Sequence, residues 1–279
     1  MEYKIYRDGL MENRKDKYLA LSEEIDFDNQ TQIRKAIIQL LILEIGLQVL
    51  YQLGPALIKL LHNHNLRELM LVLLIVVLAG VAIKFGYTTK VLNFSVKRHG
   101  LVKLLTIVYW VLVGFLVFGN LLTTFSVWSL PVKKIIEIAL IALDAGICEE
   151  LLFRGVLFNL FGVTFHKSKY DLLWASLGNS VLFGLLHLVN LTHQSVASTV
   201  GQIIFAIGLG LILSYLHILS NGIFWCIAFH FLQDFSPQVI HSDLGNPHIS
   251  LVLSVYGPII LFMVLCIYLF NHELMDSLK

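Results

Sequence analysis

Residues 172–233 read LLWASLGNSVLFGLLHLVNLTHQSVASTVGQIIFAIGLGLILSYLHILSNGIFWCIAFHFLQ, and this run of 62 residues contains no Asp, Glu, Lys or Arg. A membrane-spanning helix needs about 20 predominantly apolar residues, so the run is too long for a single helix. Polar breaks at Asn190–Thr192 and Ser220–Gly222 divide it into three segments. We therefore predict three consecutive helices that cross a lipid bilayer.

The rest of the chain has the same character. Hydrophobic residues make up 57% of the 279 residues and charged residues only 14%, whereas soluble domains carry roughly 25% charge. The composition predicts an all-α polytopic membrane protein with about eight transmembrane helices, preceded by a cytoplasmic tail at 1–35 and filling the domain 36–279. The predicted spans are about 36–60, 68–86, 101–123, 135–162, 172–190, 199–219, 221–236 and 249–270.

The distribution of Lys and Arg predicts the orientation, because cytoplasmic loops are enriched in these residues. With eight spans and the N-terminus inside, the inside segments hold 15 of them and the outside segments hold 4. We therefore expect a multi-pass protein of the cell membrane with both termini in the cytoplasm. The formal net charge of +1 gives no basic footprint for nucleic acid.

The fourth predicted span carries four charged residues within eleven positions, Asp144, Glu149, Glu150 and Arg154. Each charge at mid-helix costs roughly 2.5–3.5 kcal/mol on insertion scales, so such residues face a bundle interior or a wet cavity. Glu150 and Arg154 are four residues apart and share a helix face, which predicts a structural ion pair. Glu149 is rotated by about 100° and has no basic partner on its helix. We expect it in the drier surroundings, as the better candidate to take a proton from water.

Two other predicted helices carry histidines at one-turn spacing from a second polar residue. Asn179, Phe183 and His187 lie at intervals of four in the fifth span, and His230 and Asp234 do so in the seventh. A carboxylate one turn from an imidazole can fix its tautomer. A lone helical histidine is usually a core residue, but two of them in uncharged spans, with an intramembrane pair of glutamates, favour a functional site.

Other polar residues are predicted to have roles in packing, in support of the site, or at the solvated surface. Glu44, Gln48 and Gln52 form a stripe in the first span, either a helix-packing seam or a substrate-facing wall, and we favour packing. Asp144 could support the site from behind the reacting groups. Histidines at segment ends, among them His193 and His217, are expected to be solvated.

Three short motifs, in this order, resemble those of one family. Glu149-Glu150-Leu-Leu-Phe-Arg154 resembles the Glu-Glu-x-x-x-Arg motif of the CAAX-protease and bacteriocin-processing family, also called Abi proteins. Phe183-Gly-Leu-Leu-His187 resembles its Phe-x-x-x-His motif, and His230-Phe-Leu-Gln-Asp234 resembles its His-x-x-x-Asn/Asp motif. Each motif falls on its own predicted helix, and the part that carries them runs from about residue 135 to 236.

The resemblance implies an intramembrane endopeptidase. Eukaryotic relatives remove the last three residues of prenylated CAAX proteins, and bacterial relatives are associated with bacteriocin immunity, peptide maturation or signalling. By this resemblance, Glu149 and His187 bind and activate water, and Glu150 and Arg154 hold the fourth helix. His230 and Asp234 stabilise the oxyanion; because an ionised Asp cannot donate, Asp234 orients His230. The implied partners are membrane lipid and a peptide or membrane-anchored protein substrate.

The need for a metal stays open at this point. Glu149, His187, His230 and Asp234 could bind zinc by residue type, and the family is often described as metalloproteases. However, the chain has no HExxH helix, and metal-free activation of water by a glutamate base and a histidine fits the residues equally well. We favour the metal-free interpretation.

Two other functions fit the same residues. A catalytically silent member of the family could act as a membrane immunity or sensor-scaffolding protein. A proton-coupled transporter would use intramembrane Glu and His as a relay, although the sequence contains no inverted repeat. The motif residues are all intact, which favours the peptidase.

Overall fold

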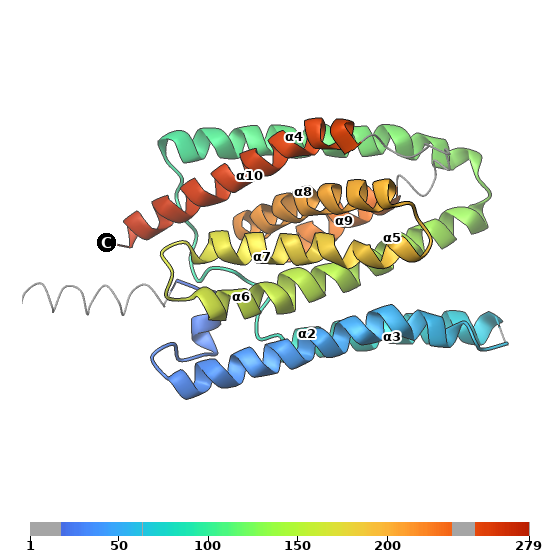
Figure 1. Cartoon of the computed structure of the whole chain (residues 1–279), viewed down its shortest axis with the longest axis horizontal. Helices are drawn as coiled ribbons and strands as arrows, with labels where there is room; N and C mark the ends of the chain where they lie inside the picture. The colour runs from blue at the N-terminus through green and yellow to red at the C-terminus, as the bar shows by residue number, and fades with distance from the viewer. Residues whose placement is uncertain (1–17, 63, 236–248, 279) are drawn as a thin grey trace, which may run out of the picture.

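The structure is a computed structural model that describes residues 18–62, 64–235 and 249–278. These residues are helical and form no β-strand, apart from one isolated bridge between Leu19 and Leu92. Figure 1 shows long helices that run roughly along one axis. In chain order they are η1 (Ala20–Glu23), α2 (Gln30–Ile58), α3 (His64–Phe85), α4 (Gly100–Thr124), η2 (Phe125–Ser129), α5 (Val132–Glu150), η3 (Leu151–Leu157), α6 (Phe158–Phe165), α7 (Asp171–Leu186), η4 (His187–Thr192), α8 (Val196–Ser220), α9 (Phe224–Phe235) and α10 (Ile249–Ser277).

Each of the eight predicted spans coincides with helical structure, and the fourth corresponds to α5, η3 and α6 in succession. Five helical segments among the described residues are long and apolar enough to cross a membrane: α2, α4, α7 with η4, α8 and α10. The other three predicted spans differ from these five. The apolar part of α3 is shorter, at Leu69–Phe85, the fourth span contains several charged residues, and α9 has 12 residues. The prediction of an all-α membrane protein is confirmed.

α8 is the central helix, because 67% of its apolar span is buried inside the protein. α7 and α10 both pack on it, while α5 packs along α9. Figure 1 shows α2 and α3 side by side along one flank and α4 with α10 along the other. Gly146 allows α5 to approach α9 closely, since a Cβ there would lie 3.2 Å from the Ile227 carbonyl oxygen. This contact sets the separation of the two helices that carry the first and third motifs.

The segment before α2 is part of the packed structure. Tyr18 is buried and its hydroxyl hydrogen-bonds to Asp171 at the start of α7. α2 begins at Gln30, six residues before the expected 36, where the Asn29 side chain accepts hydrogen bonds from the first backbone N–H groups and so satisfies donors that the helix leaves free. Residues 18–29 of the predicted tail therefore lie against the bundle, and 1–17 are outside the described residues.

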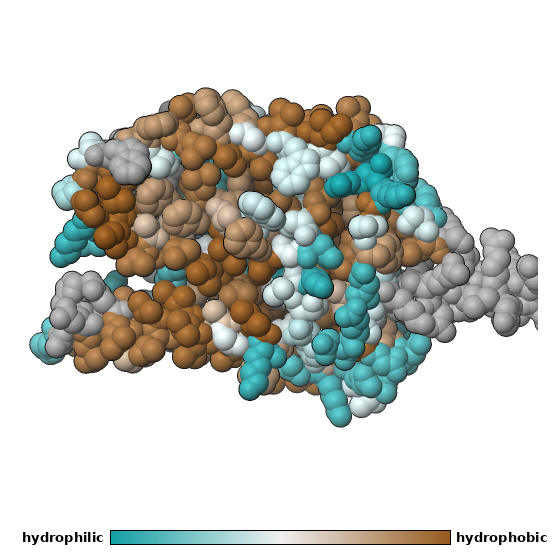
Figure 2. Space-filling view, turned by 180° about the vertical axis from the view of Figure 1, so that it is seen from behind, coloured by the Kyte–Doolittle hydropathy of each residue, from teal (hydrophilic) through white to brown (hydrophobic). Residues whose placement is uncertain are grey.

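The charged residues of the described chain are distributed unevenly between the two ends of the bundle. The connections from α3 to α4 and from α6 to α7, which contain Lys90, Lys97, Arg98, Lys167 and Lys169, lie at the same end (Figure 1). In Figure 2, which shows the molecule from behind, hydrophilic residues gather at this end while the rest of the surface is largely hydrophobic. This is the end that the Lys and Arg distribution predicts to face the cytoplasm.

Candidate active site

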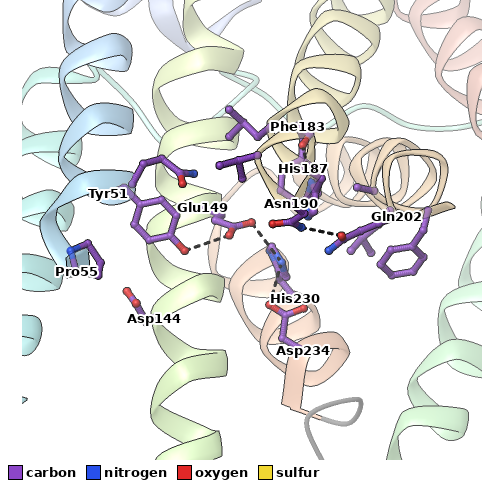
Figure 3. Close-up of a pocket in the computed structure, with 16 residues that line it drawn as sticks. Tyr51, Pro55, Asp144, Glu149, Phe183, His187, Asn190, Gln202, His230 and Asp234 are labelled. Carbon is purple, nitrogen blue, oxygen red and sulfur yellow. Dashed lines mark hydrogen bonds and ion pairs between the residues drawn. The ribbon is translucent and has the colours of Figure 1, made fainter. Parts of the chain in front are cut away.

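A cavity of about 510 Å³ lies within the bundle, between α2, α5, the end of α7, α8 and α9. It contains residues from all three motifs, which lie on different helices, and Figure 3 shows their side chains around the hollow. The lining residues are Tyr51, Gln52, Pro55, Asp144, Glu149, Phe183, Leu186, His187, Val189, Asn190, Gln202, Phe205, Ala206, Leu209, His230 and Asp234.

Glu149 reaches the cavity from the last turn of α5. Its Oε1 accepts a hydrogen bond from the Tyr51 hydroxyl (3.1 Å), and its Oε2 lies 3.8 Å from Nε2 of His230 (Figure 3). The expectation that Glu149 occupies the drier surroundings is wrong. Its side chain is 22% exposed, whereas that of Glu150 is 0% exposed, because the cavity opens beside Glu149 while Glu150 points into the packed bundle.

The predicted pair of Glu150 and Arg154 is present and fully buried. Arg154 Nη1 donates to Glu150 Oε1 (2.9 Å), and Nη2 donates to the Gly210 carbonyl oxygen (3.2 Å). The Arg154 guanidinium also lies 4.8 Å from the centre of the Phe183 ring, a cation–π contact. Arg154 belongs to a π-helical stretch, Leu151–Leu157, a widened turn that is frequent at functional sites. The pair ties the fourth span to α7 and α8.

His230 is held by the same carboxylate. Its Nδ1 donates to Glu150 Oε1 (2.7 Å), whereas Asp234 Oδ2 lies 3.5 Å from Nε2. We expected Asp234, one turn along the helix, to fix the ring, but Glu150 makes the short contact from another helix. The Nδ1–H is thereby committed, and Nε2 faces Glu149 and Asp234 at the cavity.

His187 stands at the point where α7 ends and the 3₁₀ turn η4 begins. Its Nδ1 donates to the Phe183 carbonyl oxygen (3.2 Å), so the neutral ring keeps a lone pair on Nε2. The Phe183 ring is 5.7 Å from both the His187 ring and the His230 ring, edge on in each case. Phe183 therefore contacts both imidazoles while it packs against the buried arginine.

Several residues of the cavity do not belong to the motifs. Tyr51 comes from α2, and the only sequence signal for it is its place beside the polar stripe of that helix. The stripe itself divides, because Gln48 donates to the buried Glu44 (3.1 Å) in a packing seam, while Gln52 lines the cavity. In the sequence, Asn190 indicates only a break between helices, whereas in the structure its side chain lines the cavity and donates to Gln202 (2.7 Å).

Asp144 lies where its expected supporting role places it, whereas His217 does not lie where it was expected. Asp144 lies on the cavity wall, where its carboxylate accepts a hydrogen bond from the Cys148 thiol (3.3 Å). The expectation that His217 is solvated is wrong. The side chain is buried, and its Nε2 donates to the Thr89 carbonyl oxygen (2.9 Å), because the 86–99 connection folds over the end of α8.

The four candidate metal ligands, Glu149, His187, His230 and Asp234, all line the cavity. Nevertheless, the described residues include no group of three or more His, Cys, Asp or Glu side chains arranged to hold a metal ion. The donor set does not fit a preformed metal site, and no step below is routed through a metal.

Comparison with known proteins gives one match. Residues 131–236 match the model of a protein family described as Rce1-like, type II CAAX prenyl endopeptidase Rce1-like. No curated protein and no solved structure matches the chain. The matched segment extends from just before α5 to the end of α9 and contains all three motifs, whereas α2, with Tyr51, lies outside it.

Proposed function

Because residues 131–236 carry an Rce1-like domain of the CAAX endopeptidase family, we propose that this protein is an intramembrane endopeptidase that uses the cavity between α5, α7 and α9. One observation carries the proposal: Glu149, His187 and His230, from three separate helices, line a single polar cavity of about 510 Å³. Amide hydrolysis needs a base for water and donors for the developing oxyanion, and these side chains supply both.

In the proposed reaction, Glu149 is the general base. Tyr51 holds Oε1, so Oε2 is the oxygen free to accept a proton from water, which His187 helps to position through Nε2. The water oxygen bonds to the scissile carbonyl carbon as its proton passes to Glu149. When the C–N bond breaks, the same proton moves to the leaving amine nitrogen.

His230 is the proposed donor to the oxyanion. Its Nδ1–H is committed to Glu150, so Nε2 donates only when the ring is the doubly protonated imidazolium, a form that the Asp234 carboxylate within ion-pairing distance favours. Glu150 and Arg154 act through His230 rather than on the substrate, because both are fully buried. The roles therefore divide between a reacting group at the cavity and a buried pair that positions it.

The substrate class follows from the family description. We propose that the substrate is a prenylated peptide or protein with a C-terminal CAAX sequence. A peptidase assay with full-length protein in nanodiscs tests this proposal. A farnesylated CAAX peptide should lose its last three residues, and the same peptide without the farnesyl group should react more slowly. The His187→Ala variant should be inactive, whereas His193→Ala, which changes an exposed histidine of the following connection, should retain activity.

A comparison of the peptides present in intact cells tests for substrates of other kinds. Cells that express the wild-type protein and cells that express His187→Ala should differ in at least one processed peptide. If a non-prenylated peptide differs while the farnesylated peptide is not cleaved, the endopeptidase is retained and the substrate class is wrong. If the two cell populations have the same peptides, and cells with His187→Ala show the same difference from cells that lack the protein as cells with the wild type do, the protein is a scaffold and not a peptidase.

Tyr51 provides a further prediction, because it contributes one hydrogen bond to the proposed base. We expect Tyr51→Phe to lower kcat about tenfold, the worth of one hydrogen bond to a charged group, with KM unchanged. Steady-state kinetics with the farnesylated CAAX peptide, or with the substrate that the comparison of cells identifies, measures both constants. Tyr268→Phe, which removes a hydroxyl from α10 at a residue that does not line the cavity, serves as the control. An increase in KM at constant kcat would show that Tyr51 binds substrate instead.

A further inference from the structure

A second hollow of about 510 Å³ lies at the basic end of the bundle, around the start of α4. It shares no lining residue with the cavity described above and is not explained by hydrolysis. Its walls combine basic side chains with apolar ones. The lining residues are Val96, Lys97, Arg98, His99, Lys103, Thr106, Ile107 and Trp110.

The hollow has a strongly positive lining. Lys97, Arg98 and Lys103 form no ion pair with any described residue, and no carboxylate is among the lining residues. The nearby acid Glu273 is bound to His99, through its backbone N–H (2.7 Å) and Nδ1 (3.0 Å). Three cations that form no ion pair with described residues, with one carboxylate nearby, therefore leave a net positive charge that favours an anionic ligand.

The start of α4 adds to this charge. The helix begins at Gly100 and runs for 25 residues, and the side chain of His99 does not cap its first turn. The unsatisfied N–H groups of a helix N-terminus carry partial positive charge and point toward an anion placed there. The helix end adds positive charge beside the hollow, while the contacts with an anion come from the lining side chains, because Gly100, Leu101 and Val102 are not among the lining residues.

The apolar part of the hollow identifies the ligand further. Ile107 and Trp110 follow Lys103 at helical spacing on α4, so the three residues share a face. Ile107 is 52% exposed and Trp110 is 46% exposed. Trp110 lies about 15 Å along the helix from Gly100, at a depth where acyl chains surround a spanning helix. In Figure 2, the hydrophilic end of the molecule borders a hydrophobic surface of this kind. A ligand that matches both parts has an anionic head and a hydrocarbon tail.

We propose that this hollow binds an anionic phospholipid, with its phosphate between Lys97, Arg98 and Lys103 and an acyl chain along Ile107 and Trp110. Basic clusters next to membrane helices attract anionic lipids of the cytoplasmic leaflet. The hollow lies at the end that the Lys and Arg distribution predicts to face that leaflet. The bound lipid fixes the depth of α4 in the membrane. Thr106, which lines the hollow, connects α4 to the central helix α8, because its hydroxyl lies 2.9 Å from that of Tyr215.

The test uses full-length protein in a neutral detergent and measures lipid binding by native mass spectrometry and by the shift in melting temperature. Phosphatidylglycerol should bind and raise the melting temperature, and phosphatidylcholine should do neither. The Lys97→Gln/Arg98→Gln double variant should lose at least about tenfold in affinity for phosphatidylglycerol. The matched control, Lys84→Gln/Lys167→Gln, removes two exposed charges outside the hollow and should bind like the wild type.

Three results would overturn the proposal. If phosphatidylglycerol binds no better than phosphatidylcholine, the hollow is not an anionic-lipid site. If both double variants lose affinity equally, the attraction belongs to the whole basic end. If inorganic phosphate or glycerol phosphate displaces the lipid at equal concentration, the site recognises a soluble phosphate. Unchanged melting temperature without lipid verifies that each variant is folded.

Discussion

Glu149→Gln is expected to lower kcat/KM by about 10³-fold, within the range that a positioned general base contributes. The glutamine keeps the size of the side chain and can still accept the hydrogen bond from Tyr51, so the change removes the basic oxygen and little else. Cleavage of the peptide by purified protein in nanodiscs gives the rate constants. The melting temperature of the variant should match that of the wild type, because Glu149 makes no buried ion pair with Arg154.

The matched control is Asp144→Asn. Asp144 is on the same helix and lines the same cavity, but its carboxylate contacts only the Cys148 thiol in the described structure. It should keep most of the activity, since it lies outside the constellation of Glu149 and His230. Equal losses in the two variants would mean that the cavity needs negative charge in general. A Glu149→Gln variant with more than about a tenth of the wild-type rate would exclude Glu149 as the base.

The second large effect is on stability. Arg154→Leu should destabilise the protein by about 3–5 kcal/mol, because it leaves the buried Glu150 carboxylate without its counter-charge. Glu150→Gln/Arg154→Leu should be less destabilised than Arg154→Leu alone. The double variant buries no unpaired charge, and the glutamine oxygen can still accept the Nδ1–H of His230. Equilibrium unfolding in mixed micelles measures the differences in the free energy of unfolding.

An exposed pair on the same helix provides the comparison. Lys134 and Glu137 lie 3.5 Å apart with side chains 51% and 45% exposed, and neutralising both should change stability by less than about 0.5 kcal/mol. If Arg154→Leu falls in that small range, the buried pair does not hold the bundle together. If the double variant is the less stable of the two, Glu150 contributes packing or hydrogen bonds that outweigh its charge.

The sequence alone was enough to predict the membrane fold and the acidic and histidine side chains that line the cavity, namely Glu149, His187, His230 and Asp234. Lipid excludes charge, so uncharged runs such as 172–233 indicate spans, and a Glu–Glu–Arg cluster inside a span stands out against them. The pair of Glu150 and Arg154 was predictable for the same local reason, because residues four apart share a helix face. The three motifs also pointed to the family whose model matches residues 131–236.

Only the tertiary structure decided which groups meet. Glu150 holds His230 across 80 residues of sequence, and Tyr51 holds Glu149 across 98. Helical periodicity says which residues share a face but not which faces pack together, so Asp234 was expected in the place that Glu150 takes. Exposure was likewise decided by packing, since the cavity opens beside Glu149 and leaves its neighbour fully buried. Local geometry is encoded within a turn or two of the chain, whereas contacts between helices depend on how all of them pack.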